Sequence, residues 1–100
     1  MPLRLAYSAE ATGDLEAIYR HIAPDSPATA DRFVRGIEAR CEALRETPQL
    51  GVARPDLREG VRIFSFRRRV AIAYRIEDEA VLVLRVFYGG QDYEAIMGGE

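Results

Sequence analysis

Two helix-like segments precede three strand-like segments in this chain, and this order constrains its fold more than any other feature. Residues 9–22 and 27–46 show helical periodicity on either side of a Pro-Asp-Ser-Pro break, and residues 61–88 hold the three strand-like stretches. A further strand-like stretch, residues 3–7, comes first. Each element must bury its apolar face against another element. The order therefore predicts an α+β fold in which a helical hairpin lies on a small antiparallel β-meander.

The two helical segments each carry apolar residues at helical spacing. On the first segment, this stripe consists of Leu15, Ile18, Tyr19 and Ile22. On the second segment, it consists of Ala30, Phe33, Ile37, Cys41 and Leu44. Ser8 and Ser26 stand where a serine side chain caps a helix. One stripe per helix favours packing of both helices into a shared core, which makes Cys41 a buried thiol.

The later part of the chain changes to a period of two, which is typical of strands. The three predicted strands cover residues 61–66, 70–76 and 81–88. The last of them is apolar apart from Arg85, as expected for a strand that is covered on both faces. Residues 47–60 are predicted to form an ordered connection, and residues 93–97 a short C-terminal helix or tail.

The length of 100 residues predicts one domain spanning residues 1–100. A composition of 48% hydrophobic and 30% charged residues is typical of a soluble globular domain. No apolar run approaches the ~18–20 residues of a membrane span, and no secretory stretch follows Met1. The single cysteine cannot form an internal disulfide. We therefore expect a cytoplasmic protein.

All fourteen basic residues are arginine. Either mutational bias in a GC-rich genome or a need for planar, two-point contacts explains this. The net charge is −2, yet residues 61–90 carry six arginines and three acids, a net of +3. A pI near 5.5 argues against direct DNA binding by this chain alone. Arg67-Arg68-Arg69 is predicted to crown a hairpin, as a solvated turn or as a recognition patch for phosphate or an acidic partner.

Arg85 is a second candidate for a binding residue, because a charge within an apolar strand must be paired or must reach a sheet edge or a groove. One alternative is a salt bridge with an acid such as Asp92 or Glu94. The other alternative is a surface site that Arg85 shares with Arg62 and Tyr88. Both alternatives predict that Arg85→Ala impairs the protein.

No assembled catalytic machinery is evident. The sequence contains no Walker loop, no Ser-His-Asp set and no dinucleotide fingerprint. His21, the only histidine, stands near the end of the first helix, where a cation favours the helix dipole, and one histidine and one cysteine on different helices carry no metal-ligand spacing. We therefore expect no catalytic residue, no metal and no cofactor, and an action by docking onto another macromolecule.

Five fragments carry a family resemblance. They are Ala28-Thr29-Ala30-Asp31-Arg32-Phe33, then Leu44 with Pro48 and Gly51, then Leu57-Arg58-Glu59-Gly60-Val61-Arg62, then Ala73-Tyr74-Arg75-Ile76, and finally Leu84-Arg85-Val86-Phe87-Tyr88-Gly89. In this order and spacing they resemble the ParE branch of the RelE/ParE toxin superfamily, over about residues 3–94.

The resemblance implies the toxin half of a bacterial type II toxin–antitoxin pair, the kind of system associated with plasmid stabilisation. It implies a helical hairpin on a small, mainly antiparallel sheet. It also implies a ParD-like antitoxin that wraps a C-terminal segment around the toxin, often as a heterotetramer of two toxins and two antitoxins. ParE-like toxins are associated with inhibition of DNA gyrase, so we expect a non-enzymatic gyrase inhibitor.

The RelE-like branch implies an alternative, because its members cut messenger RNA on the ribosome. They use basic residues on the sheet and a tyrosine or histidine near the C-terminus. Here Arg62 and Tyr93 match that pattern, and Tyr88 replaces the histidine that many members carry before the glycine. The other basic positions hold Phe64, Ala71 and Gln91, which cannot stabilise phosphate charge as arginine or lysine would. A nuclease using Arg62, Arg85 and Tyr93 is thus the second hypothesis.

A non-toxic interaction module is the third hypothesis. Under the first, the candidate residues for binding the target or the antitoxin are Arg62, Arg67, Arg68, Arg69, Arg85, Tyr88 and Tyr93.

Overall fold

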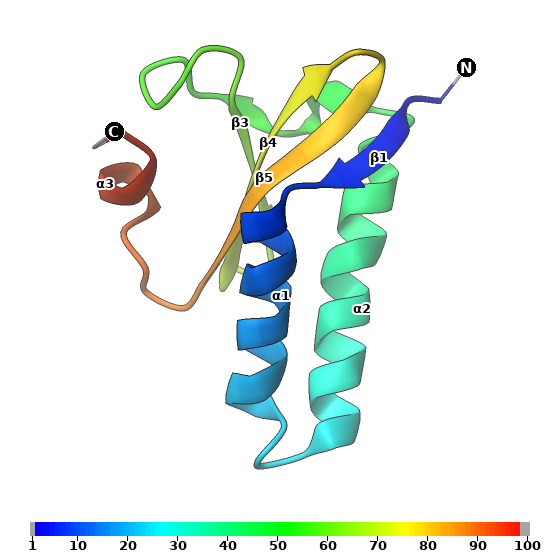
Figure 1. Cartoon of the computed structure of the whole chain (residues 1–100), viewed down its shortest axis with the longest axis vertical. Helices are drawn as coiled ribbons and strands as arrows, with labels where there is room; N and C mark the ends of the chain where they lie inside the picture. Colours follow the sequence, from blue (N-terminus) through cyan, green and yellow to red (C-terminus); the bar gives the residue numbers. More distant parts are fainter. Residues whose placement is uncertain (1, 99–100) are drawn as a thin grey trace.

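Nine segments of regular structure lie within residues 2–98, the part of the chain that the computed structural model describes. They are β1 (Arg4–Tyr7), α1 (Ala9–Ile22), α2 (Pro27–Ala43), a 3₁₀ helix (Pro48–Leu50), β2 (Val52–Ala53), β3 (Arg62–Phe66), β4 (Val70–Glu77), β5 (Ala80–Tyr88) and α3 (Tyr93–Gly98). These strands form one sheet in the order β1-β5-β4-β3-β2. β1 runs parallel to β5, and the other neighbours are antiparallel. The predicted α+β fold is confirmed (Figure 1).

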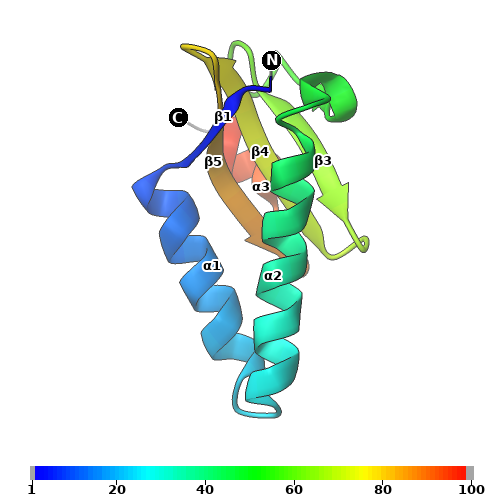
Figure 2. The ribbon, with the colours of Figure 1, turned by 90° about the vertical axis from the view of Figure 1, so that its right-hand side faces the viewer.

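α1 and α2 lie side by side and cover one face of the sheet (Figure 2). The side-chain oxygens of Ser8 and Ser26 cap them, as predicted, by accepting hydrogen bonds from the N–H groups of Ala11 at 3.0 Å and Thr29 at 3.2 Å. Most of the apolar stripe of each helix meets the sheet in a main core, whereas Tyr19 of the predicted α1 stripe is 39% exposed and Leu44 packs in a smaller cluster with Tyr74 and Val81. The buried members of the main core include Leu15, Ile18, Ile37, Cys41, Ile72, Val83 and Val86.

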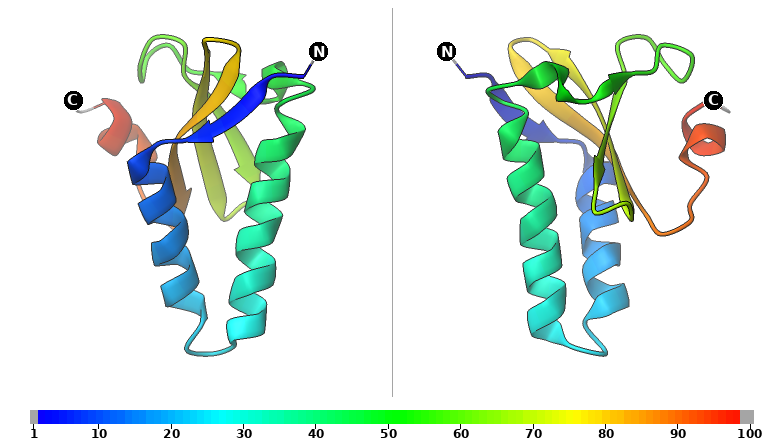
Figure 3. Two further views of the ribbon diagram at one scale, coloured as in Figure 1. Left: turned by 45° about the vertical axis from the view of Figure 1, so that its right-hand side comes forward. Right: turned by 180° about the vertical axis from the view of Figure 1, so that it is seen from behind.

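The opposite face of the sheet is covered by α3 and by the connection that precedes β3. A second core forms there from Leu57, Val61, Ile63, Ala73, Phe87 and Met97. Figure 3 shows α3 and the helical hairpin on opposite sides of the sheet. β5 is thus covered on both faces, as its apolar sequence predicts. Among residues 2–98, no helix combines the length and the apolar character that crossing a membrane requires.

α2 ends at Ala43, three residues before the predicted end at residue 46. The N–H groups of Leu44 and Arg45 bond to carbonyls three residues earlier, so the last turn tightens. The Arg45 carbonyl then accepts the N–H of Leu3 at 3.1 Å, and its guanidinium donates to the Leu3 carbonyl at 2.7 Å. Contact with the start of the chain therefore ends the helix early.

The connection over residues 47–60 is more structured than predicted, because it contains the 3₁₀ helix and β2. β2 places Val52 opposite Ile63 and Ala53 opposite Arg62. Two residues are too few to carry a periodic signal. This strand exists because β3 offers it a partner.

Candidate functional site

Arg62 on β3 is tied to the connection that precedes its strand. Its guanidinium donates a hydrogen bond to the Gly51 carbonyl at 2.7 Å. The Tyr74 hydroxyl on β4 donates to the Pro48 carbonyl at 2.6 Å and accepts the N–H of Gly51 at 2.9 Å. Burial raises the pKa of the Tyr74 hydroxyl, which therefore keeps its proton and both bonds. Arg62 thus holds the 3₁₀ segment against the sheet.

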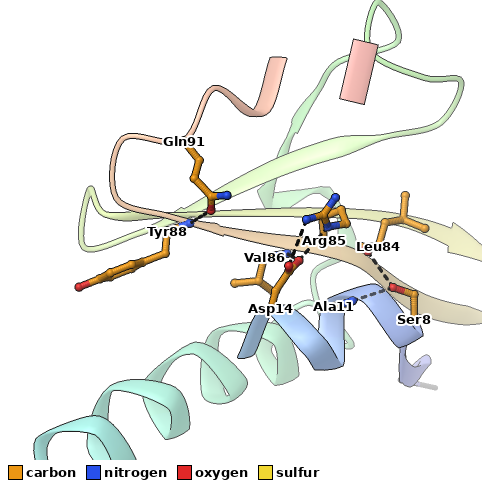
Figure 4. A network of polar contacts seen from close by, with 8 residues as sticks. All are labelled: Ser8, Ala11, Asp14, Leu84, Arg85, Val86, Tyr88 and Gln91. Atoms are coloured by element: carbon orange, nitrogen blue, oxygen red, sulfur yellow. Dashed lines mark hydrogen bonds and ion pairs between the residues drawn. The ribbon is translucent and has the colours of Figure 1, made fainter. Parts of the chain in front are cut away.

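Arg85 on β5 forms the predicted salt bridge with an acid, but the acid is Asp14 of α1 and not Asp92 or Glu94. Its guanidinium donates to both carboxylate oxygens of Asp14, at 2.8 and 3.1 Å. The same carboxylate accepts the backbone N–H of Val86 at 2.8 Å, as Figure 4 shows. The hydrogen bond to Asp14 raises the pKa of Arg85. This charge is therefore neutralised within the fold.

The end of β1 explains why Asp14 is needed there. β1 pairs with β5 only as far as Val83, so the rest of β5 has no strand on that side. Ser8 provides hydrogen bonds to the first backbone carbonyls of β5 that β1 leaves without a partner. Its N–H donates to the Val83 carbonyl at 2.9 Å, and its hydroxyl donates to the Leu84 carbonyl at 2.7 Å. Asp14 covers the N–H of Val86. The N-cap residue Ser8 and the Asp14 side chain of α1 thus replace the missing strand.

Arg67, Arg68 and Arg69 form the exposed turn between β3 and β4, as predicted. The φ angles of Arg67 and Arg68 are 52° and 59°, in the left-handed region that residues other than glycine rarely adopt. The Arg67 guanidinium lies 5.1 Å from the ring centroid of Phe66. Within residues 2–98, none of the three arginines has an acidic side chain at ion-pair distance.

Arg68 and Arg69 line a hollow of about 150 Å³ near the end of β5, on the side of the sheet that carries α3. Its remaining lining consists of Ser65, Val70, Ala71, Phe87, Gly89, Gln91 and Tyr93. The rings of Phe87 and Tyr93 are 5.8 Å apart between centroids. The hollow therefore brings two of the predicted arginines and a predicted tyrosine together.

Tyr88 lies on the side of the sheet that carries the helical hairpin. Its ring makes edge contacts with His21 and Phe33, at centroid distances of 5.7 and 5.5 Å. Its N–H donates to the side-chain oxygen of Gln91 at 2.9 Å (Figure 4). Hollows of about 210 and 250 Å³ flank the ring, and Arg69 lines the larger one.

We name this region the β5-end surface and define it as Arg68, Arg69, Tyr88, Gln91 and Tyr93. Arg67 adjoins it on the turn, whereas Arg62 and Arg85 lie elsewhere and do not form a site with Tyr88. Sequence reasoning missed Asp14, which carries no signal because it is one of several acids on α1. It considered Gln91 only as a position where RelE-like members carry a basic residue, and missed its hydrogen bond with the N–H of Tyr88.

The β5-end surface suits contact better than enclosure of a substrate. Five hollows on the described residues, including those at this surface, measure about 120 to 250 Å³, below the ~300–1,000 Å³ of pockets that enclose a drug-sized ligand. No cluster of three potential metal ligands occurs within residues 2–98. Cys41 is buried, as predicted, and burial raises the pKa of its thiol to about 11.

Fold and surface together define a class of protein: a small α+β domain with a helical hairpin on one face of its sheet and exposed arginines at one end. Residues 5–93 match the family model described as the ParE toxin of the parDE type II toxin–antitoxin system. The chain therefore belongs to the ParE toxin family.

Individual relatives agree with this membership. The chain is 30% identical over 96 residues to Toxin ParE3 of Caulobacter vibrioides, a match that covers 95% of each chain. It also resembles a solved chain of the chromosomal ParDE toxin–antitoxin system from P. aeruginosa, with a TM-score of 0.75, 26% identity, and coverage of 87% of this chain and 96% of that one.

A more distant likeness concerns the fold alone. A chain of the RelBE2 toxin–antitoxin complex from Mycobacterium tuberculosis matches with a TM-score of 0.53 and 23% identity. The match covers 88% of this chain and 99% of that chain.

Proposed function

We propose that this chain is a non-enzymatic toxin that binds DNA gyrase directly, stalls replication and is neutralised by a ParD-like antitoxin. The observation that carries this proposal is the separation of the candidate side chains. Arg62 and Arg85 are engaged by backbone and by Asp14. Tyr88 and Tyr93 line different hollows.

This separation favours docking over cleavage. Cleaving a phosphodiester requires a base, an acid and charge stabilisation around one phosphate. Exposed arginines and half-buried tyrosines, as found here, are instead the residues that protein interfaces favour. We assign the contact with the target or the antitoxin to the β5-end surface, together with Arg67.

The antitoxin part of the proposal is supported by family membership and by the ParDE system to which one solved relative belongs. We infer a cytoplasmic complex of two toxins and two antitoxins, in which residues 1–100 form one toxin domain. An antitoxin segment that lies in an apolar groove of the toxin fits the recurring mode in which a helix occupies such a groove.

The test combines three measurements on the full chain. Purified protein should inhibit supercoiling by gyrase, induced expression should arrest growth and elicit the DNA-damage response, and the neighbouring small reading frame should restore growth and co-purify. Unchanged supercoiling would remove the gyrase part of the proposal. Codon-specific cuts in translated messages, mapped by primer extension, would favour the nuclease hypothesis. Unaffected growth would favour a non-toxic module.

A further inference from the structure

We propose that the hollow between the β3–β4 turn and α3 binds a carboxylate side chain from an acidic segment of a protein partner. This inference takes from the proposed function only that the partner is a protein. It adds which chemical group of the partner binds here. The size of the hollow is the first argument. At about 150 Å³ it is too small for a typical ligand pocket but has room for one side chain.

The lining of the hollow is the second argument, because its polar side chains can all donate hydrogen bonds and no acid is among them. These side chains are Ser65, Arg68, Arg69, Gln91 and Tyr93. The side-chain oxygen of Gln91 already accepts the N–H of Tyr88, so its amide NH₂ is the group left for a ligand. Guanidinium groups bind carboxylates through two parallel hydrogen bonds. The lining therefore selects an acceptor with negative charge.

The turn itself is the third argument. Arg67 and Arg68 both adopt positive φ, as Asp78 and Glu79 do in the β4–β5 turn, because hairpin turns of this kind require it at both central residues. Six acids form ion pairs with arginines outside the turn, and none of these pairs includes an arginine of the turn. The six acids are Asp14, Asp31, Glu42, Asp56, Glu77 and Glu94. Three adjacent arginines in this exposed turn repel one another. A partner that contributes a carboxylate relieves this repulsion.

The surroundings favour a carboxylate side chain over nucleic acid. Val70, Ala71 and Phe87 give the hollow an apolar part that suits the methylene groups of an aspartate or glutamate. Asp92 and Glu94 flank Tyr93 in sequence, and the whole chain has a net charge of −2. A phosphate backbone carries a fixed charge at every nucleotide and would meet those like charges, whereas a peptide carries its charges on flexible side chains, one of which is enough to fill the hollow.

The test is a titration of the isotope-labelled full chain, followed by NMR, with an acetylated hexaglutamate peptide as the probe. The matched hexaglutamine peptide and a twelve-residue oligothymidylate serve as reference ligands. We expect saturable shifts at the amide groups of Arg68, Arg69 and Tyr93 with hexaglutamate alone. The double variant R68Q/R69Q should weaken this binding at least tenfold, about 1.4 kcal/mol.

The control variant R20Q/R32Q removes the same charge from two exposed arginines on the helices. It should change the affinity by no more than about twofold, since neither arginine lines the hollow and charges exposed to solvent are screened by salt. An equal loss in both variants, or tighter binding of the oligothymidylate, would overturn the inference. Because the titration does not involve gyrase, peptide binding without gyrase inhibition would contradict only the proposed function. Gyrase inhibition without peptide binding would contradict only this inference.

Discussion

Asp14 and Arg85, which are 71 residues apart in the sequence, form a two-point ion pair at the edge of the sheet, with distances of 2.8 and 3.1 Å. The pair lies where β1 has ended and β5 continues without a neighbour. The same carboxylate accepts the N–H of Val86. α1 is therefore attached to the sheet at the point where strand pairing stops.

Asp14→Ala should destabilise the protein strongly. Both side chains are mostly buried, with exposures of 17% for Asp14 and 27% for Arg85, and the substitution leaves the guanidinium and a backbone N–H without their acceptor. We expect the free energy of unfolding to fall by about 2–4 kcal/mol, measured by urea denaturation. The control is Asp31→Ala, which breaks an exposed pair with Arg35 and should cost less than about 1 kcal/mol. Similar losses in both variants would contradict this role.

Gly51→Ala should also destabilise the protein, for a steric reason. A Cβ atom at this position would lie 2.6 Å from the Tyr74 ring and 2.7 Å from its hydroxyl oxygen. Tyr74 is fully buried and holds two hydrogen bonds there, so it cannot yield. We expect a loss of about 1–3 kcal/mol. The matched variant is Gly13→Ala in α1, where a Cβ atom meets no atom within 4 Å. It should instead stabilise the protein by about 1 kcal/mol. Thermal unfolding of both variants should show a lower melting temperature for Gly51→Ala and a higher one for Gly13→Ala.

Cys41 should be unreactive while the protein is folded. Burial raises the pKa of its thiol from 9.0 to about 11, so at pH 8 only about one thiol in a thousand is ionised. The thiol has a higher pKa in the folded protein than in the unfolded chain. Its ionisation therefore leaves the free energy of unfolding unchanged below pH 9 and lowers it as the pH rises from 9 to about 11. Alkylation by iodoacetamide at pH 8 should be far slower in buffer than in urea. Equal rates would show that the thiol is accessible.

Arg62 and Arg67 should affect different properties. Arg62→Gln removes a charged hydrogen bond to the Gly51 carbonyl and should lower stability by about 1.5–3 kcal/mol. Arg67→Gln changes an exposed turn residue and should alter stability by less than about 0.5 kcal/mol, while weakening co-purification with the partner. Melting temperature and yield of the complex are measured for each variant. If Arg67→Gln lowers stability as much as Arg62→Gln does, the division of roles is wrong.

Local periodicity was sufficient to predict most of the fold. The apolar stripes and the caps at Ser8 and Ser26 predicted both helices, and the N-terminal bounds of α1 and α2 agree with the structure. The alternation of residues 61–88 predicted three strands, because the period of two is a property of the strand itself. β2 and the early end of α2 were missed, since each depends on a partner elsewhere in the chain.

The sequence by itself determined the helices, the meander and the exposed arginine turn, because these follow from spacings of two to four residues and from turn chemistry. Only the tertiary structure decided which charged residues remain available to a partner. Arg85 was recognisable as a charge that needs neutralising, but its partner, Asp14, is contributed by another element. Ion pairs depend on distances in space, and no local pattern records which of the sixteen acids the fold brings within hydrogen-bonding distance of a given arginine.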